Sequence, residues 1–90
     1  MKKINDTLKE RDNSHGHFAD TASIAQSIKW VFRNEQKWRT LNHIQMESLD
    51  LIATKCARIL SGDPDLTEHW YDINGYSELA RQDAESRSKK

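Results

Sequence analysis

The strongest constraint on the fold is a stretch between residues 41 and 61 in which apolar side chains recur with the period of an α-helix. Gly62 and Pro64 follow at once, and together they end a helix, because glycine suits the residue after the last turn and proline cannot continue it. We therefore expect a central helix over about 41–61, with Thr40 as its N-cap and a length of roughly 30 Å at about 1.5 Å per residue. Its apolar arc, which we expect to be core, comprises Met46, Leu49, Ile52, Ala53, Cys56, Ala57, Ile59 and Leu60.

A second helix over about 66–84 is expected to return along the first and form a helical hairpin. Its predicted inner face comprises Leu66, Trp70, Ile73, Tyr76, Ala80 and Ala84. Helical spacing also appears within residues 1–13 and after an N-cap at Asp20 or Thr21, where the predicted core stripe comprises Ile24, Ala25, Ile28, Val31 and Phe32. Residues 14–19 are expected to form a loop that Phe18 holds to the core. The predicted fold is all-α: a small bundle of about four helices in one domain, residues 1–84, with a disordered polar tail, residues 85–90.

Composition limits the classes of partner. Fourteen Lys and Arg balance fourteen Asp and Glu, so no global field attracts nucleic acid, and we expect no nucleic-acid partner. No run approaches the roughly 20 apolar residues that span a bilayer, and the charged N-terminus lacks the apolar stretch of a signal peptide. One cysteine, Cys56, forms no internal disulfide, which favours a reducing compartment. We expect a soluble cytoplasmic protein that contacts no membrane.

Three apolar residues fall outside the predicted core stripes. Trp30 lies opposite the apolar stripe of its helix, and Ile44 and Leu51 interrupt the polar side of the central helix. Apolar side chains in such positions favour a contact surface. We expect them to form an interface through which the protein self-associates.

The polar side of the central helix offers residues that could bind a ligand. Glu47 and Asp50, one turn apart, could hold Mg²⁺ through carboxylate oxygens, and Lys55 and Arg58 could hold a phosphate. The alternative is an ordinary solvated face, since acids that precede bases suit the helix dipole.

The four histidines do not predict a metal site. His15 and His17 flank Gly16, but His43 and His69 have no matching spacing with them, and a closed site needs four ligands. We expect no metal centre.

Several motifs together resemble a family of small uncharacterised phage and prophage proteins. They are Glu10-Arg11, the run from Ser14 to Phe18, the run from Lys55 to Pro64, and the run from Asp72 to Tyr76. The resemblance implies a helical fold and a phage or prophage source. It extends, more distantly, to phage proteins linked to nucleotide modification and to the all-α nucleotide pyrophosphohydrolases.

Those pyrophosphohydrolases use two acidic pairs on facing helices to hold Mg²⁺. Here Glu47 and Asp50 supply one such pair, whereas Glu68 and Asp72 are four residues apart rather than three, and His17 stands where the phage family carries an acid. We therefore do not expect this chain to have the hydrolase activity of the pyrophosphohydrolases.

We expect a binding protein rather than an enzyme, one that self-associates, engages an unidentified protein partner and needs no cofactor. The alternative is a nucleotide- or phosphate-binding protein, or a degenerate pyrophosphohydrolase with Mg²⁺. Its pocket residues would be His15, Lys55, Arg58, Asp72 and Tyr76. A third possibility is structural: Arg58 and Asp72 would form a buried ion pair within the hairpin.

Overall fold

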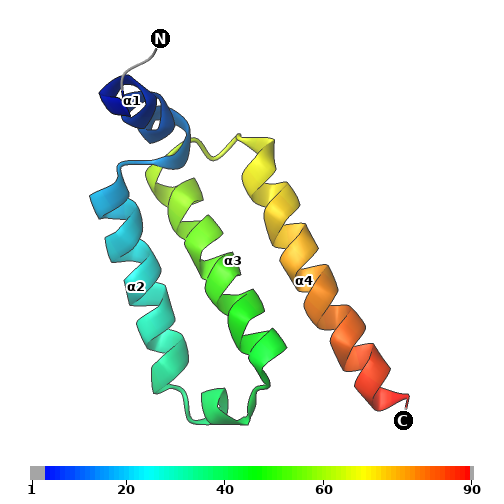
Figure 1. Cartoon of the computed structure of the whole chain (residues 1–90). Coiled ribbons are helices and arrows are strands. Elements are labelled where there is room, and N and C mark those ends of the chain that lie inside the picture. Colours follow the sequence, from blue (N-terminus) through cyan, green and yellow to red (C-terminus); the bar gives the residue numbers. More distant parts are fainter. Residues whose placement is uncertain (1–3, 90) are drawn as a thin grey trace.

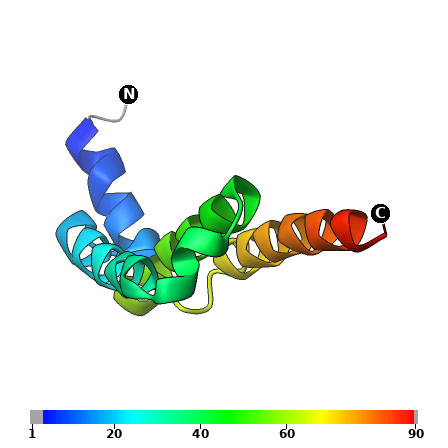
Figure 2. The ribbon, with the colours of Figure 1, turned by 90° about the horizontal axis from the view of Figure 1, so that it is seen from below.

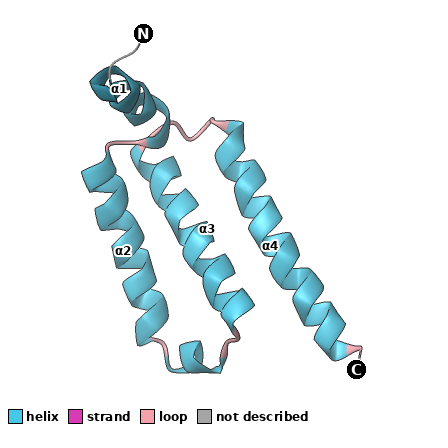
Figure 3. Ribbon diagram, in the orientation of Figure 1, coloured by secondary structure: helices cyan, strands magenta, loops and turns pink. Residues whose placement is uncertain are grey.

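The computed structural model describes residues 4–89 and confirms the all-α class within them. The elements are α1 (Ile4–His15), α2 (Phe18–Asn34), a short 3₁₀ helix η1 (Gln36–Thr40), α3 (His43–Ser61) and α4 (Thr67–Ser88). Figure 3 shows that short loops join them, with no strand in this part of the chain. The predicted central helix and its hairpin partner are α3 and α4.

The helices form an open layer. Helices α2, α3 and α4 lie side by side with α3 in the middle, and α1 projects from one face of this layer (Figures 1 and 2). The molecule measures 54 × 26 × 22 Å, and its radius of gyration is 15.7 Å, against about 12 Å for a compact chain of this length. Within the described residues, α1 covers one end of one broad face of the layer, and no helix covers the other.

Small side chains hold α2 and α4 against α3. The buried apolar residues of the described chain are Ala25, Ala53 and Ala57, whose size lets helix backbones approach closely. At one end of α2, the Thr21 and Ser61 hydroxyls share a hydrogen bond of 2.8 Å. The predicted core is confirmed for Ala53 and Ala57 in the central arc and for Ala25 in α2, and it is wrong for Leu60 and Val31, which are 70% and 52% exposed. Met46, Leu49, Ile52, Cys56 and Ile59 of the central arc are half-buried.

The helix boundaries differ from prediction at several points. Asn42 caps α3 through a capping box with Gln45, so Thr40, which ends η1, is not the cap. Helix α2 begins at Phe18, which is exposed and does not hold a loop to the core. Helix α4 continues to Ser88, through most of the tail predicted to be disordered.

Two glycines fix the position of α1. Gly16 has a φ of +85°, which glycine adopts without strain, and the turn it makes leads the chain from α1 into α2. A Cβ atom at Gly62 would lie 2.5 Å from the Gly16 nitrogen, so the turn crosses directly over the end of α3. The backbone N–H of Asp63 donates to the Ser14 carbonyl at 3.2 Å. The base of α1 is thus attached to the loop between α3 and α4.

Candidate functional site

The predicted ligand residues Lys55 and Asp72 bind each other. Lys55 Nζ lies 2.7 Å from Asp72 Oδ2, bridging α3 and α4, and the two side chains are only 16% and 27% exposed. The proposed Arg58–Asp72 ion pair is therefore wrong. Successive helix residues are rotated by about 100°, which turns Arg58 roughly 60° away from Lys55, toward the side of the layer that carries α1. Tyr76 lies half-buried one turn beyond Asp72.

A basic cluster, Arg11, His15 and Arg58, lies where α1 meets α3. Partial burial, and then the charge of Arg11, lower the pKa of Arg58, whose guanidinium has no hydrogen bond or ion pair with any described residue. Burial likewise lowers the pKa of His15, helped by Arg11, His69 and Arg58 and opposed by Glu68. The structure therefore brings His15 near Arg58 but leaves both outside the Lys55–Asp72 pair.

His69 was missed by the sequence prediction, although it is fully buried. Its ring meets His15 edge to face at 5.0 Å, and its Nε2 lies 3.4 Å from the Ser14 carbonyl oxygen. Its Nδ1 has no partner among the described residues. Trp70, predicted to face inward, is exposed instead, and its indole N–H donates to the Pro64 carbonyl at 2.7 Å. The sequence offered one indication that His69 is buried: it lies on the same face of α4 as Asp72 and Tyr76, at positions three and seven residues apart.

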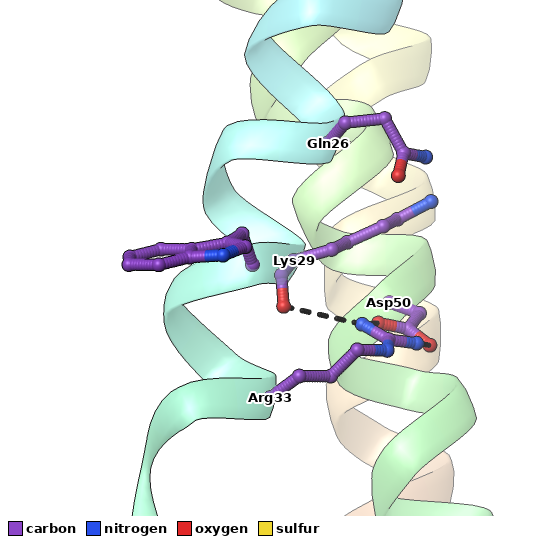
Figure 4. Close-up of a pocket in the computed structure, with 5 residues that line it drawn as sticks. Gln26, Lys29, Arg33 and Asp50 are labelled. Carbon is purple, nitrogen blue, oxygen red and sulfur yellow. Dashed lines mark hydrogen bonds and ion pairs between the residues drawn. The ribbon is translucent and has the colours of Figure 1, made fainter.

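The face of the layer that carries α1 is charged. Figure 4 shows Arg33 reaching from α2 to Asp50 on α3, beside Gln26 and Lys29. Two bonds of 3.1 and 2.7 Å join this guanidinium to the carboxylate. Asp50 is thus engaged with Arg33 rather than placed with Glu47 around a cation. Among the side chains that the structure describes, those of residues 4 and 7–89, no group of three or more His, Cys, Asp or Glu could hold a metal ion.

The three residues predicted to form an interface belong to this charged face or its border. Trp30 is 66% exposed and lines the same hollow as Gln26 and Arg33. Helical rotation places Ile44 and Leu51 on the side of α3 that also carries Arg58. Ile44 is exposed and Leu51 half-buried. That these three residues form the interface of self-association stays a prediction.

The opposite face of the layer is apolar. On α3, Asp50 and Ser61 contact α2, and Lys55 contacts α4. These contacts lie on opposite sides of the helix, so the middle of the predicted core arc points between them, out of the layer. We define the apolar face by the residues that this rotation places there on the three helices: Ile24, Ile28, Val31, Met46, Leu49, Cys56, Leu60, Trp70 and Ile73.

A groove runs along this apolar face between α3 and α4. It encloses about 310 Å³, and its lining comprises Leu41, Gln45, Ser48, Leu49, Ile52, Ser77 and Ala80. No ionisable side chain lines it. The groove suits apolar side chains of a partner rather than a charged ligand.

Comparison with known proteins found no matching family model, curated protein or solved structure. The resemblance to small phage proteins stays a prediction from sequence motifs. Among the described residues, no helix combines the length and apolar character needed to cross a bilayer.

Proposed function

We propose that this protein acts by binding other proteins and by self-association, not by catalysis. The observation that supports this is its surface area. The chain exposes 6881 Å², whereas a folded monomer of 10.5 kDa exposes about 5,400 Å². Large apolar side chains are among the exposed residues of this helical layer, including Trp30, Val31, Leu60 and Trp70, and large uncovered apolar surfaces are typical of interaction sites.

The charged face is the surface we propose for a different protein partner. Trp30 is a large exposed side chain beside the Arg33–Asp50 pair, and interface hot spots are enriched in such aromatic residues with polar groups around them. Ile44 would add an exposed apolar contact on the neighbouring helix, with Leu51 beside it. The resemblance to phage proteins favours a partner of the host or the phage, in the bacterial cytoplasm.

A matched pair of variants tests the charged face. Trp30→Ala removes the proposed hot spot, and Tyr71→Ala removes an aromatic residue of similar exposure, 76% against 66%, from the outer edge of α4. When tagged proteins are recovered from an infected or lysogenic host, native protein and Tyr71→Ala should retain the same partner, and Trp30→Ala should lose it. Recovery that is equal for all three would contradict the proposed surface.

Binding of a nucleotide or phosphate is a second candidate, supported by the basic cluster. Arg58 is half-buried beside Arg11 and His15, and it has no acidic partner among the described residues. A bound anion would offset the repulsion between these basic side chains. A nucleotide with Mg²⁺ at 100 times its Kd should stabilise the fold by about 2.7 kcal/mol. A thermal-shift screen measures this, and Arg58→Met should abolish the shift. If no nucleotide or phosphate shifts the melting temperature, this candidate is wrong.

A further inference from the structure

We propose that a second copy of this chain covers the apolar face, so that two helical layers stack into a symmetric dimer. The inference rests on the proposed function, because it names the partner of one of the two faces. Its evidence is separate from that for the charged face: the composition of the apolar face, its extent and the size of the core beneath it.

The apolar face runs across all three helices of the layer. Val31 on α2, Leu60 on α3 and Trp70 on α4 are each more than half exposed on it. Between them lie Leu49 and Cys56, and helical rotation places no charged residue on this side of α3. Such a strip of apolar side chains, three helices wide, has the composition of a domain core that has been cut in half.

The surplus area lies in the range that an obligate homodimer buries. The chain exposes about 1,500 Å² more than a compact monomer of its mass, and an obligate homodimer buries about 2,000–5,000 Å² in total, or about 1,000–2,500 Å² on each partner. One layer stacked on an identical layer can therefore remove the surplus. A twofold axis brings the same apolar patch of both copies together, so no further complementarity is required.

The small core identifies the occupant as a second copy. Beneath the apolar face, the buried apolar side chains of the described chain are three alanines. A layer with so little core needs its covering whenever it is folded, and a second copy is present wherever this chain is made, at the concentration of the chain itself. A charged ligand would find no ionisable group in the groove between α3 and α4.

Such a dimer leaves the charged face available. Helix α1 projects from the face opposite the apolar one, since the basic cluster joins it to the Arg58 side of α3 (Figure 2). Stacking through the apolar face therefore does not collide with α1. Both charged faces point outward, and the dimer presents two copies of Trp30 to other proteins.

Two glutamate variants test the assignment of the face. Leu60→Glu places a charge on the apolar face, and Leu79→Glu is the matched control, because Leu79 is 59% exposed on the charged side of α4. Light scattering after size exclusion, at tens of micromolar, on the order of ordinary assay concentrations, should give about twice 10.5 kDa for native protein and for Leu79→Glu. Leu60→Glu should be a monomer, with dimerisation weakened by about 100-fold or more, because both copies carry the change. Val31→Glu, on α2, should act like Leu60→Glu.

The outcomes separate this inference from the proposed function. A dimer that survives both Leu60→Glu and Val31→Glu overturns the assignment of the face while self-association stands. A monomeric native protein overturns self-association, yet loss of the cellular partner by Trp30→Ala would still support protein binding.

Cys56 provides a measurement on the unaltered chain, which removes any concern that a variant fails to fold. It is the one cysteine and lies half-buried on the apolar face. Its rate of labelling by a thiol reagent should fall at least about tenfold as the protein concentration rises through the Kd of the dimer. A rate independent of concentration would overturn the proposal.

Discussion

The Lys55–Asp72 ion pair yields a quantitative prediction about the α3–α4 contact. Its 2.7 Å distance and low exposure place it between a surface pair and a buried one. Two unit charges about 4 Å apart attract by about 4 kcal/mol at an effective dielectric constant of about 20, and desolvation together with side-chain ordering cancels most of this. A net contribution of about 1–2 kcal/mol remains, as for other hydrogen bonds between charged groups.

A double-mutant cycle with Lys55→Met and Asp72→Ala measures that contribution. Denaturant unfolding at one fixed protein concentration should give a coupling energy of about 1–2 kcal/mol, and each single variant should lower the melting temperature by about 4–8 °C per kcal/mol lost. A coupling energy below about 0.3 kcal/mol would refute the view that this pair joins the two helices.

Arg58→Met is the contrasting control in the same experiment. Arg58 has no acidic partner among the described residues and lies near Arg11, so removing its charge while keeping an apolar stem should leave stability unchanged or raise it by up to about 1 kcal/mol. If Arg58 instead formed a buried ion pair with Asp72, its loss would cost about 3–5 kcal/mol. A loss of that size would show that the pairing described here is wrong.

Two further predictions concern the glycines and pH. Gly75→Ala should stabilise the protein by about 0.5–1 kcal/mol in thermal unfolding, because nothing lies within 4 Å of the added Cβ. Gly16→Ala should destabilise it by at least about 1–2 kcal/mol, because the φ of Gly16 is +85° and the added Cβ would clash with Ser61. Equal effects of the two substitutions would contradict the conformation described for the turn after α1. The folded pKa of His15 is below its ordinary value of 6.5, so the unfolded chain binds more protons below pH 6.5, and stability should fall as the pH drops through that value toward the folded pKa. His15→Gln should flatten this dependence in denaturant titrations at several pH values, and an unchanged slope would show that another group is responsible.

The positions of the helices could be predicted because their signals are local. The apolar period between residues 41 and 61, followed by Gly62 and Pro64, predicts a helix that ends near Ser61, and α3 ends there. In the connection that follows α2, Trp38 stacks on Phe32 with a centroid distance of 5.8 Å. Such features depend on neighbours a few residues away.

The sequence could not predict what packs against each helical face. An apolar stripe indicates that a face is covered, but the covering element can belong to the same chain or to another molecule. The stripe around Leu49 and Leu60 was interpreted as the core of this chain, yet α2 and α4 pack on either side of it. Likewise, whether Lys55 or Arg58 reaches Asp72 depends on about 60° of rotation about the axis of α3, which only the packed structure determines.

A second copy of the chain that covers the apolar face makes the mass in solution depend on protein concentration. Static light scattering of the native protein across a dilution series from tens of micromolar downward, on the order of accessible concentrations, measures this dependence. The predicted result is a mass near twice 10.5 kDa that falls toward 10.5 kDa on dilution, with a melting temperature that falls in parallel. A constant mass of 10.5 kDa, with a melting temperature independent of concentration, would contradict the claim.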